Sequence, residues 1–194
     1  MTTSEPATDP FRVVKPASGM VGLLIAVSVG IAVSVGLGVY GNLHEPTFFA
    51  LNIAGFSSGV AAKAWLASLA FLLAIVQLVS ALIMYGKFPG VRRGPRWIGT
   101  LHRWSGRSAV LVSVPVAVHC LYALGFDPSA PRVLVHSLLG CFFYGAFAAK
   151  MIILQRSNTP GWSLPLFGGL VFTVLTGLWL TAALWFFTTT GFTL

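Results

Sequence analysis

The chain alternates between long apolar stretches and short polar connections. Five apolar stretches of about 20 residues qualify as membrane spans, at about residues 20–40, 61–85, 108–126, 133–154 and 164–188. A helix of this length crosses the hydrocarbon core of a bilayer, because lipid offers no hydrogen-bond partners and a helix satisfies its own backbone groups. The pattern predicts an all-α fold, an integral membrane bundle of five transmembrane helices.

Composition supports this prediction and narrows the class of protein. Hydrophobic residues make up 56% of the chain and charged residues only 8%, whereas about a quarter of the residues of soluble domains are charged. We expect a single transmembrane domain over residues 19–194, in a multi-pass protein of the plasma membrane. Residues 1–18 are polar and too acidic at their start for a signal peptide, so we expect a disordered cytoplasmic tail.

The distribution of charge predicts the orientation of the bundle. The chain has 12 basic residues against four acidic ones, a net charge of +8. Ten of the basic residues lie before the first span, between the second and third, or near the end of the fourth, and only Lys63 and Arg132 lie at the other ends. By the positive-inside rule the N-terminus is cytoplasmic and the C-terminus is outside. The charge thus indicates topology and contact with anionic headgroups of the lipid bilayer, not nucleic acid as a partner.

Two histidines stand inside apolar stretches on either side of the polar break "DPSAP". His119 precedes Phe126 by seven residues, which places it about 10 Å inside the outer end of the third span. Ser129 is a candidate N-cap and Pro131 a candidate first residue of the fourth span, so His136 lies about 8 Å inside that span. Two imidazoles at matched depth on consecutive antiparallel helices are suited to be the axial ligands of a haem iron.

Neighbouring residues fit a haem between these helices. Gly140 lies one turn after His136 on the same face, where a missing side chain leaves clearance for a flat macrocycle. Pro115, four residues before His119, removes a helical hydrogen bond and favours a bend or a local polar site. The alternative is that both histidines hydrogen-bond to neighbouring helices and hold the bundle together.

The other two histidines have different expected roles. His102 precedes His119 by about 25 Å of continuous helix, so the two do not share an iron. We expect His102 at the headgroup level, contacting lipid phosphate, a quinone or a partner; as a second haem ligand it would need Met84 or Met151 opposite it. His44 lies in the loop after the first span, where we expect a solvated side chain, with a loop cover over the cofactor as the alternative.

Three further features bear on how the helices pack and where they begin. The first span places Gly30, Ser34 and other small residues among larger apolar ones, which predicts a close packing face. Cys120 and Cys141 fall inside the third and fourth spans, where we expect packing residues, with a disulfide as the alternative. The segment from Trp97 onward is expected to lead into the third span along the interface, because one straight helix from there would be about 45 Å long.

Short motifs in the third and fourth spans carry a family resemblance. They are "LHRWSGR" and "AVHCLYALGF" in the third span and "VLVHSLLG" in the fourth. These segments resemble the haem-bearing helices of the cytochrome b561 and ferric-reductase type of membrane protein. In those families an HRxxGR-like entry is followed on the same helix by a second histidine, the places of His102 and His119. His136 resembles the partner ligand on the following helix.

The resemblance covers about a third of the chain and implies haem binding and electron transfer. The chain is also similar to a small actinobacterial membrane family with the same "LHRWSGR" and "VHSLLGCFFYGAFAAK" segments, from which no activity follows. In the dihaem proteins the partner helix carries two histidines, whereas the fourth span here has only His136. We therefore expect one haem b near the outer face, with His119 and His136 as axial ligands.

Two functions follow from these expectations. The first is a membrane b-type cytochrome that transfers electrons between a quinol or membrane reductase and an outer acceptor. It would be an electron-transfer subunit of a larger complex, for example of a respiratory chain, and not a self-contained catalyst. The alternative is a cofactor-free accessory or assembly subunit, in which the same histidines join helices and the small-residue faces bind partner spans.

Overall fold

The computed structural model describes residues 19–49, 55–91 and 94–194, and the expected tail over residues 1–18 lies outside them. The described residues form helices and connections without a β-strand. Five helices are long and apolar enough to cross a membrane, which confirms the predicted fold class. The elements are α1 (Gly19–Leu43), α2 (Gly59–Met84), α3 (Ile98–Val118), the π-helical η1 (His119–Leu124), α4 (Pro131–Leu154), α5 (Ser163–Trp179), the π-helical η2 (Leu180–Leu184) and α6 (Trp185–Thr190).

The third long helix begins well before the predicted span, which starts near residue 108, and an interfacial position for its first turns stays a prediction. α3 and η1 run without a break over Ile98–Leu124. The early turns are held by α2, because the side chain of Gln77 donates to the carbonyl of His102 and, over 2.8 Å, to Ser105 Oγ. Ser80 Oγ lies 2.8 Å from Nδ1 of His102. These polar contacts between two helices keep a basic segment helical where hydropathy alone favoured an interfacial lead-in.

α4 begins at Pro131 as predicted, but its cap differs from the prediction. The residue at the N-cap is Ala130, which has no side-chain acceptor, so Ser129 as N-cap was wrong. The backbone N–H of Ser129 instead donates to Oδ1 of Asp127 over 2.8 Å. An aspartate that bonds the backbone two residues later closes a tight turn, and this turn uses Ser129 before the helix starts.

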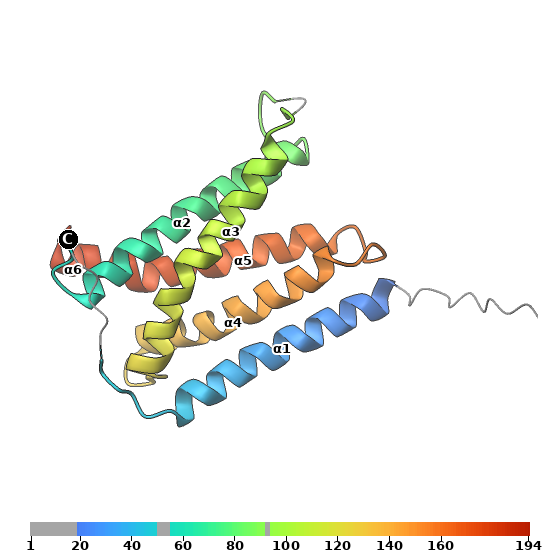
Figure 1. The fold of residues 1–194 in the computed structure, drawn as a ribbon. Helices are drawn as coiled ribbons and strands as arrows, with labels where there is room; N and C mark the ends of the chain where they lie inside the picture. Colours follow the sequence, from blue (N-terminus) through green and yellow to red (C-terminus); the bar gives the residue numbers. More distant parts are fainter. Residues whose placement is uncertain (1–18, 50–54, 92–93) are drawn as a thin grey trace, which may run out of the picture.

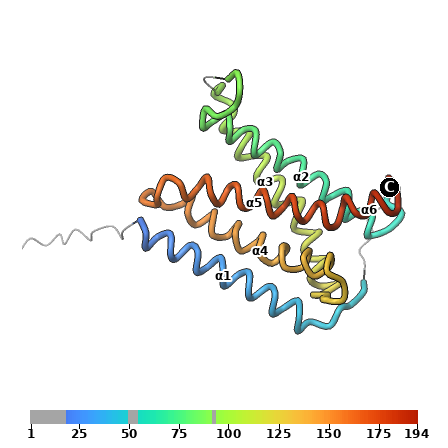
Figure 2. The backbone as a smooth tube through the Cα atoms, turned by 180° about the vertical axis from the view of Figure 1, so that it is seen from behind, coloured from blue at the N-terminus to red at the C-terminus, as the bar shows by residue number. Residues whose placement is uncertain are grey.

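The helices form two groups. α1, α4 and α5 lie side by side, with α4 in contact with both of its neighbours, while α2 and α3 form a separate pair. Figures 1 and 2 show this pair crossing the other three helices and diverging from them toward the α2–α3 connection. The groups meet at the opposite end, called here the α3–α4 end, which also carries the last turns of α1 and α6 and the first turn of α2.

The contact between α1 and α4 depends on small residues. A side-chain carbon at Gly30 would lie 2.7 Å from the carbonyl oxygen of Gly145, closer than atoms of this kind approach. A side-chain carbon at Gly145 would collide with Ser34 Oγ. The predicted packing face of the first span is therefore confirmed at Gly30 and Ser34.

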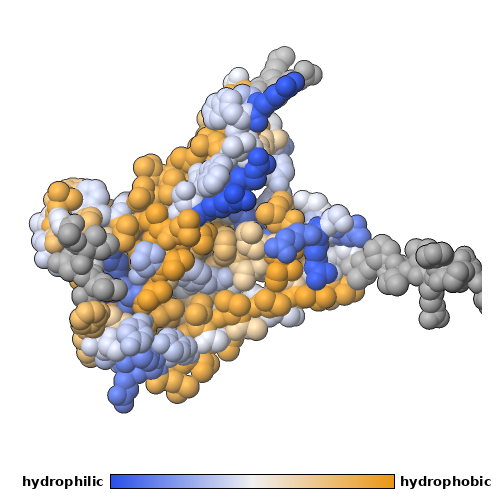
Figure 3. Space-filling view, in the orientation of Figure 1, coloured by the Kyte–Doolittle hydropathy of each residue, from blue (hydrophilic) through white to orange (hydrophobic). Residues whose placement is uncertain are grey.

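The outer surface of the bundle fits a lipid bilayer. Large apolar side chains along the helices are exposed, for example Leu72 on α2, Leu111 on α3 and Leu138 on α4. Figure 3 shows apolar side chains over the lengths of the helices, with hydrophilic ones mainly toward their ends. Exposed apolar area on this scale is stable in lipid and not in water, so the chain is a multi-pass membrane protein.

Candidate functional site

A cavity of about 460 Å³ lies inside the bundle, toward the α3–α4 end. All five spanning helices contribute to its wall, and most of the wall is apolar. The space exists because α3 and α4, although consecutive, make few close contacts. The two helices are joined across the cavity wall by Ser113, whose Oγ lies 3.1 Å from the hydroxyl of Tyr144. Ligand pockets have volumes of about 300–1,000 Å³, and this cavity falls within that range.

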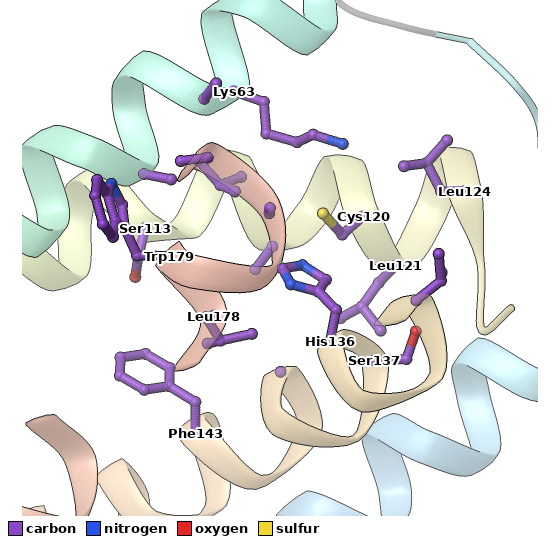
Figure 4. A pocket seen from close by; sticks show the side chains of 18 of the residues that line it. Lys63, Ser113, Cys120, Leu121, Leu124, His136, Ser137, Phe143, Leu178 and Trp179 are labelled. Carbon is purple, nitrogen blue, oxygen red and sulfur yellow. The ribbon is translucent and has the colours of Figure 1, made fainter. Parts of the chain in front are cut away.

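His136 lies in the wall of this cavity, half-buried on the second turn of α4. Figure 4 shows its ring rising from α4 into the space below η1 and beside η2. Nδ1 of the ring lies 2.9 Å from the hydroxyl oxygen of Thr181, a residue of η2. The ring is thus anchored through one nitrogen to a neighbouring helix.

The hydrogen bonds of Thr181 suit one of the two neutral forms of the His136 ring. The Thr181 hydroxyl has one proton, and it lies 2.8 Å from an acceptor in its own helix, the carbonyl of Gly177. With the proton donated there, the oxygen accepts from Nδ1 of His136, and we assign the Nδ1-protonated ring on this ground. In the neutral imidazole the other nitrogen, Nε2, then carries a lone pair. A metal-binding histidine has this arrangement, with one nitrogen donating to a neighbour and the other free to ligate.

Gly140 lies one turn after His136 and also lines the cavity. A side-chain carbon built at Gly140 would touch only the Leu178 side chain, at 4.0 Å. The glycine therefore leaves space that a larger side chain would fill. This is the clearance expected for a flat ligand beside His136.

His119 does not join His136 in the cavity wall. It is the first residue of η1 and is half-buried, and the next residue, Cys120, is the one that lines the cavity. Successive residues of a helix differ in direction by about 100°. The structure thus places His119 one residue away from the wall, beside the candidate site but not in it.

Two π-helical segments flank the cavity. η1 contributes Cys120 and Leu121 to one wall, and η2 contributes Ala182 and Ala183 to the opposite one. π-helical turns are rare and are frequently found at functional sites. η1 begins one turn after Pro115, where the sequence favoured a local irregularity, but η2 has no such proline.

The part of the cavity wall nearest the α3–α4 end of the bundle, called here the mouth, is charged. Lys63, Asp127 and Arg132 all line it. Asp127 is anionic at neutral pH, because hydrogen bonds from the hydroxyl and the backbone N–H of Ser129 lower the pKa of its carboxyl. The mouth therefore has two cations and one anion, in front of an apolar interior.

The structure does not bring His102 to this cavity. Its Nδ1 is paired with Ser80 Oγ, and its carbonyl accepts from Gln77, as described above. Both contacts join α3 to α2. Contact with lipid, a quinone or a second haem through its other ring nitrogen stays a prediction.

His44 also lies outside the cavity wall. Its ring is stacked between those of Tyr40 and Tyr122, with ring centres 5.1 and 4.9 Å away. Nε2 lies 3.1 Å from the carbonyl oxygen of Tyr122, in η1. These contacts tie the loop after α1 to the end of η1. Among the described residues of this loop, Phe48 reaches the cavity.

Both cysteines line the cavity and are free thiols in this structure. Cys120 belongs to η1 and Cys141 to α4, so each is placed as the predicted packing residue. The alternative of a disulfide between the two helices is not formed.

The sequence analysis did not assign three residues to the site, namely Thr181, Lys63 and Arg132. Lys63 and Arg132 entered only as charges in the topology count. Lys63 had a signal in the sequence, because a cation within a predicted span needs a position that faces away from lipid. Arg132 precedes its predicted span and had no such signal. Thr181 had no comparable signal, since a threonine in a membrane helix usually bonds to its own backbone.

Comparison with known proteins gives a family but no activity. No curated protein and no solved structure matches the chain at a significant level. A family model described as "Family of unknown function (DUF6529)" matches residues 22–194, which include all the cavity-lining residues and the spanning helices apart from the first three residues of α1. The chain therefore belongs to the DUF6529 family.

Proposed function

We propose that this protein is a membrane b-type cytochrome that holds one haem in the cavity, with His136 as an axial ligand. The observation that carries the proposal is the position of His136: its Nδ1 lies 2.9 Å from Oγ1 of Thr181, and its ring lies in the wall of an apolar cavity. With the proton on Nδ1, Nε2 carries the lone pair that would bind the iron. A bound haem would supply one-electron redox chemistry. The chain would supply the ligand, the clearance at Gly140 and apolar walls, which exclude water and tune the potential.

The described residues fit this cofactor better than they fit a bare metal ion. They contain no group of three or more His, Cys, Asp or Glu side chains arranged for a metal ion. A haem iron is bound in its plane by the porphyrin and asks the protein for one or two axial ligands only. His136 meets that requirement for one side.

His119 is the proposed second ligand. It begins a π-helical turn and lies one residue from cavity-lining Cys120. A π-turn holds one residue more than an α-turn, so a change of register in η1 would turn the neighbouring position toward the cavity. With His119 bound the iron has six ligands, and with His136 alone it has five, which visible spectroscopy distinguishes.

The position of the cavity supports electron transfer within a larger assembly. Its wall uses α4 from Arg132 to Tyr144 and α3 with η1 from Ser113 onward, which is one half of the bundle. A haem there would serve one membrane face, the outer face by the predicted orientation. Electrons from a quinol or a membrane reductase would reach it through a partner subunit.

The proposal is tested by haem content in histidine variants. His136→Ala should lose the bound pigment, and His119→Ala should lose it or convert a six-coordinate spectrum to a five-coordinate one. His44→Ala is the matched control, since it removes a histidine at the same end of the bundle whose ring does not line the cavity. Full haem retention in both His119→Ala and His136→Ala would overturn the assignment.

The second candidate function is a cofactor-free accessory or assembly subunit. The observation that favours it is that His44, His102 and His136 all hydrogen-bond within the bundle, as helix-joining histidines do. Under this function the folded protein stays colourless when haem is supplied. His136→Ala would then lower thermal stability without any change in absorbance.

A further inference from the structure

The two basic residues at the α3–α4 end both face the cavity. In the described part of the chain the other basic residues lie toward the other end of the spans, and they are Lys87, Arg96, Arg103, Arg107, Lys150 and Arg156. Lys63 and Arg132 both belong to the cavity wall. Both also lie near enough to His136 to act electrostatically on its imidazole. The few cations of this end are thus gathered around one site.

Lys63 projects into the cavity from the second turn of α2. The start of this helix is fixed by Ser58, whose hydroxyl accepts from the backbone N–H of Ala61 over 3.1 Å. Figure 4 shows the Lys63 side chain reaching over Cys120 and His136. Within the described part of the chain its ammonium makes no hydrogen bond and no ion pair. An ammonium at this depth is costly unless an anion or water meets it.

Arg132 is held in place at the other side of the mouth. One of its terminal nitrogens donates to the carbonyl of Thr181 over 2.6 Å. Its guanidinium lies over the ring of Trp185, 3.8 Å from the ring centre. A guanidinium has five N–H donors, so most remain for a ligand. The same Thr181 anchors His136, which couples the position of the cation to that of the proposed axial ligand.

We propose that Lys63 and Arg132 bind the two carboxylates of the haem and so direct its carboxylate edge toward the α3–α4 end. This inference rests on the proposed function. Haem has an apolar macrocycle with two carboxylates on one edge, and the cavity has an apolar interior with two cations at one end. The carboxylate of Asp127 repels an anionic ligand at the same mouth, so the charges of both Lys63 and Arg132 are needed for a net attraction.

The test compares two probes on the purified full-length protein in detergent. The probes are haem and its dimethyl ester, in which both carboxylates are masked. Wild-type protein should bind haem more tightly than the ester by about tenfold or more, because the ester cannot form the charge-assisted hydrogen bonds that the two carboxylates would make with Lys63 and Arg132. Lys63→Gln should reduce that ratio, and Lys63→Gln with Arg132→Gln should bring it close to one.

Two controls separate this inference from loss of folding and from failure of the proposed function. Lys87→Gln removes a cation at the other end of α2 and should leave the ratio unchanged. Unaltered ester binding shows that a variant is folded, and if Arg132→Gln fails this check, Lys63→Gln alone decides the result. If Lys63→Gln prefers haem over the ester as strongly as the wild type does, the inference is overturned and the proposed function is not. Wild-type protein that takes up neither probe overturns both the inference and the proposed function.

Discussion

His136 and Thr181 are 45 positions apart in the chain, yet Nδ1 of the histidine lies 2.9 Å from Oγ1 of the threonine. The hydroxyl also lies 2.8 Å from the carbonyl of Gly177, which suits the tautomer in which the histidine donates and the threonine accepts. The carbonyl of Thr181 meanwhile holds Arg132. One residue of η2 thus orients both the proposed axial ligand and one of the cations at the cavity mouth.

Thr181→Val should weaken haem binding by about 10–100-fold, the usual cost of removing a partner that orients a metal ligand. Valine keeps the shape of the side chain but has no oxygen to accept the Nδ1 proton. Haem titration followed by absorbance measures the effect. Thr181→Ser should restore most of the affinity.

Thr176→Val is the matched control for this prediction, because the Thr176 hydroxyl donates only within its own helix, to the carbonyl of Phe172. It should leave haem affinity unchanged. Equal affinity in Thr181→Val and wild type would mean that the hydroxyl does not orient His136 toward a metal.

Gly140→Leu should abolish haem binding while the protein still folds. The added side chain would enter the cavity, since a carbon at Gly140 meets only Leu178 nearby. Gly36→Leu is the control, an exposed position on α1 with nothing close to it. Haem content per chain after purification is the measurement, and a haem-loaded Gly140→Leu protein would show that the ligand lies elsewhere.

Gly30→Ala should destabilise the bundle by about 1–3 kcal/mol, the usual cost of overpacking. The new methyl group would press on the carbonyl of Gly145, 2.7 Å away. Thermal unfolding in detergent should show a lower midpoint for Gly30→Ala and no decrease for Gly36→Ala. Similar midpoints for the two variants would contradict the close α1–α4 contact.

His102→Ala should lower stability by about 0.5–1.5 kcal/mol, the net contribution of one hydrogen bond, and leave haem content unchanged. The bond lost is the one to Ser80, which joins α3 to α2. Thermal unfolding and a pyridine haemochrome assay on the same sample measure both effects. Loss of half the haem would instead reveal a second haem near His102, at the end of the bundle that carries the α2–α3 connection.

Hydropathy and proline placement predicted most of the fold. The five spans and the first residue of α4, Pro131, agree with the structure because lipid requires long apolar helices and proline suits a first helical turn. The third long helix starts earlier than the predicted span, at Ile98. Its first turns are held by contacts of Gln77 and Ser80 with α3, and such contacts between helices leave no mark in the hydropathy of one segment.

The candidate site was predictable only in part. Depth along the span predicted His136 near one end of α4, and the helical repeat predicted Gly140 on the same face; both residues line the cavity. The direction of His119 was not predictable, because the register of η1 departs from the α-helical repeat on which such an estimate rests. Thr181 was missed because its partnership with His136 depends on how α5 and η2 pack against α4.

The central claim is tested most directly by a reduced-minus-oxidised absorbance spectrum of the purified wild-type protein in mild detergent, after expression with added haem. The account predicts the sharp α-band of a b-type haem, at about one haem per chain. A folded, monodisperse preparation that shows no such band would contradict it, and His136 would then be a residue that joins α4 to η2.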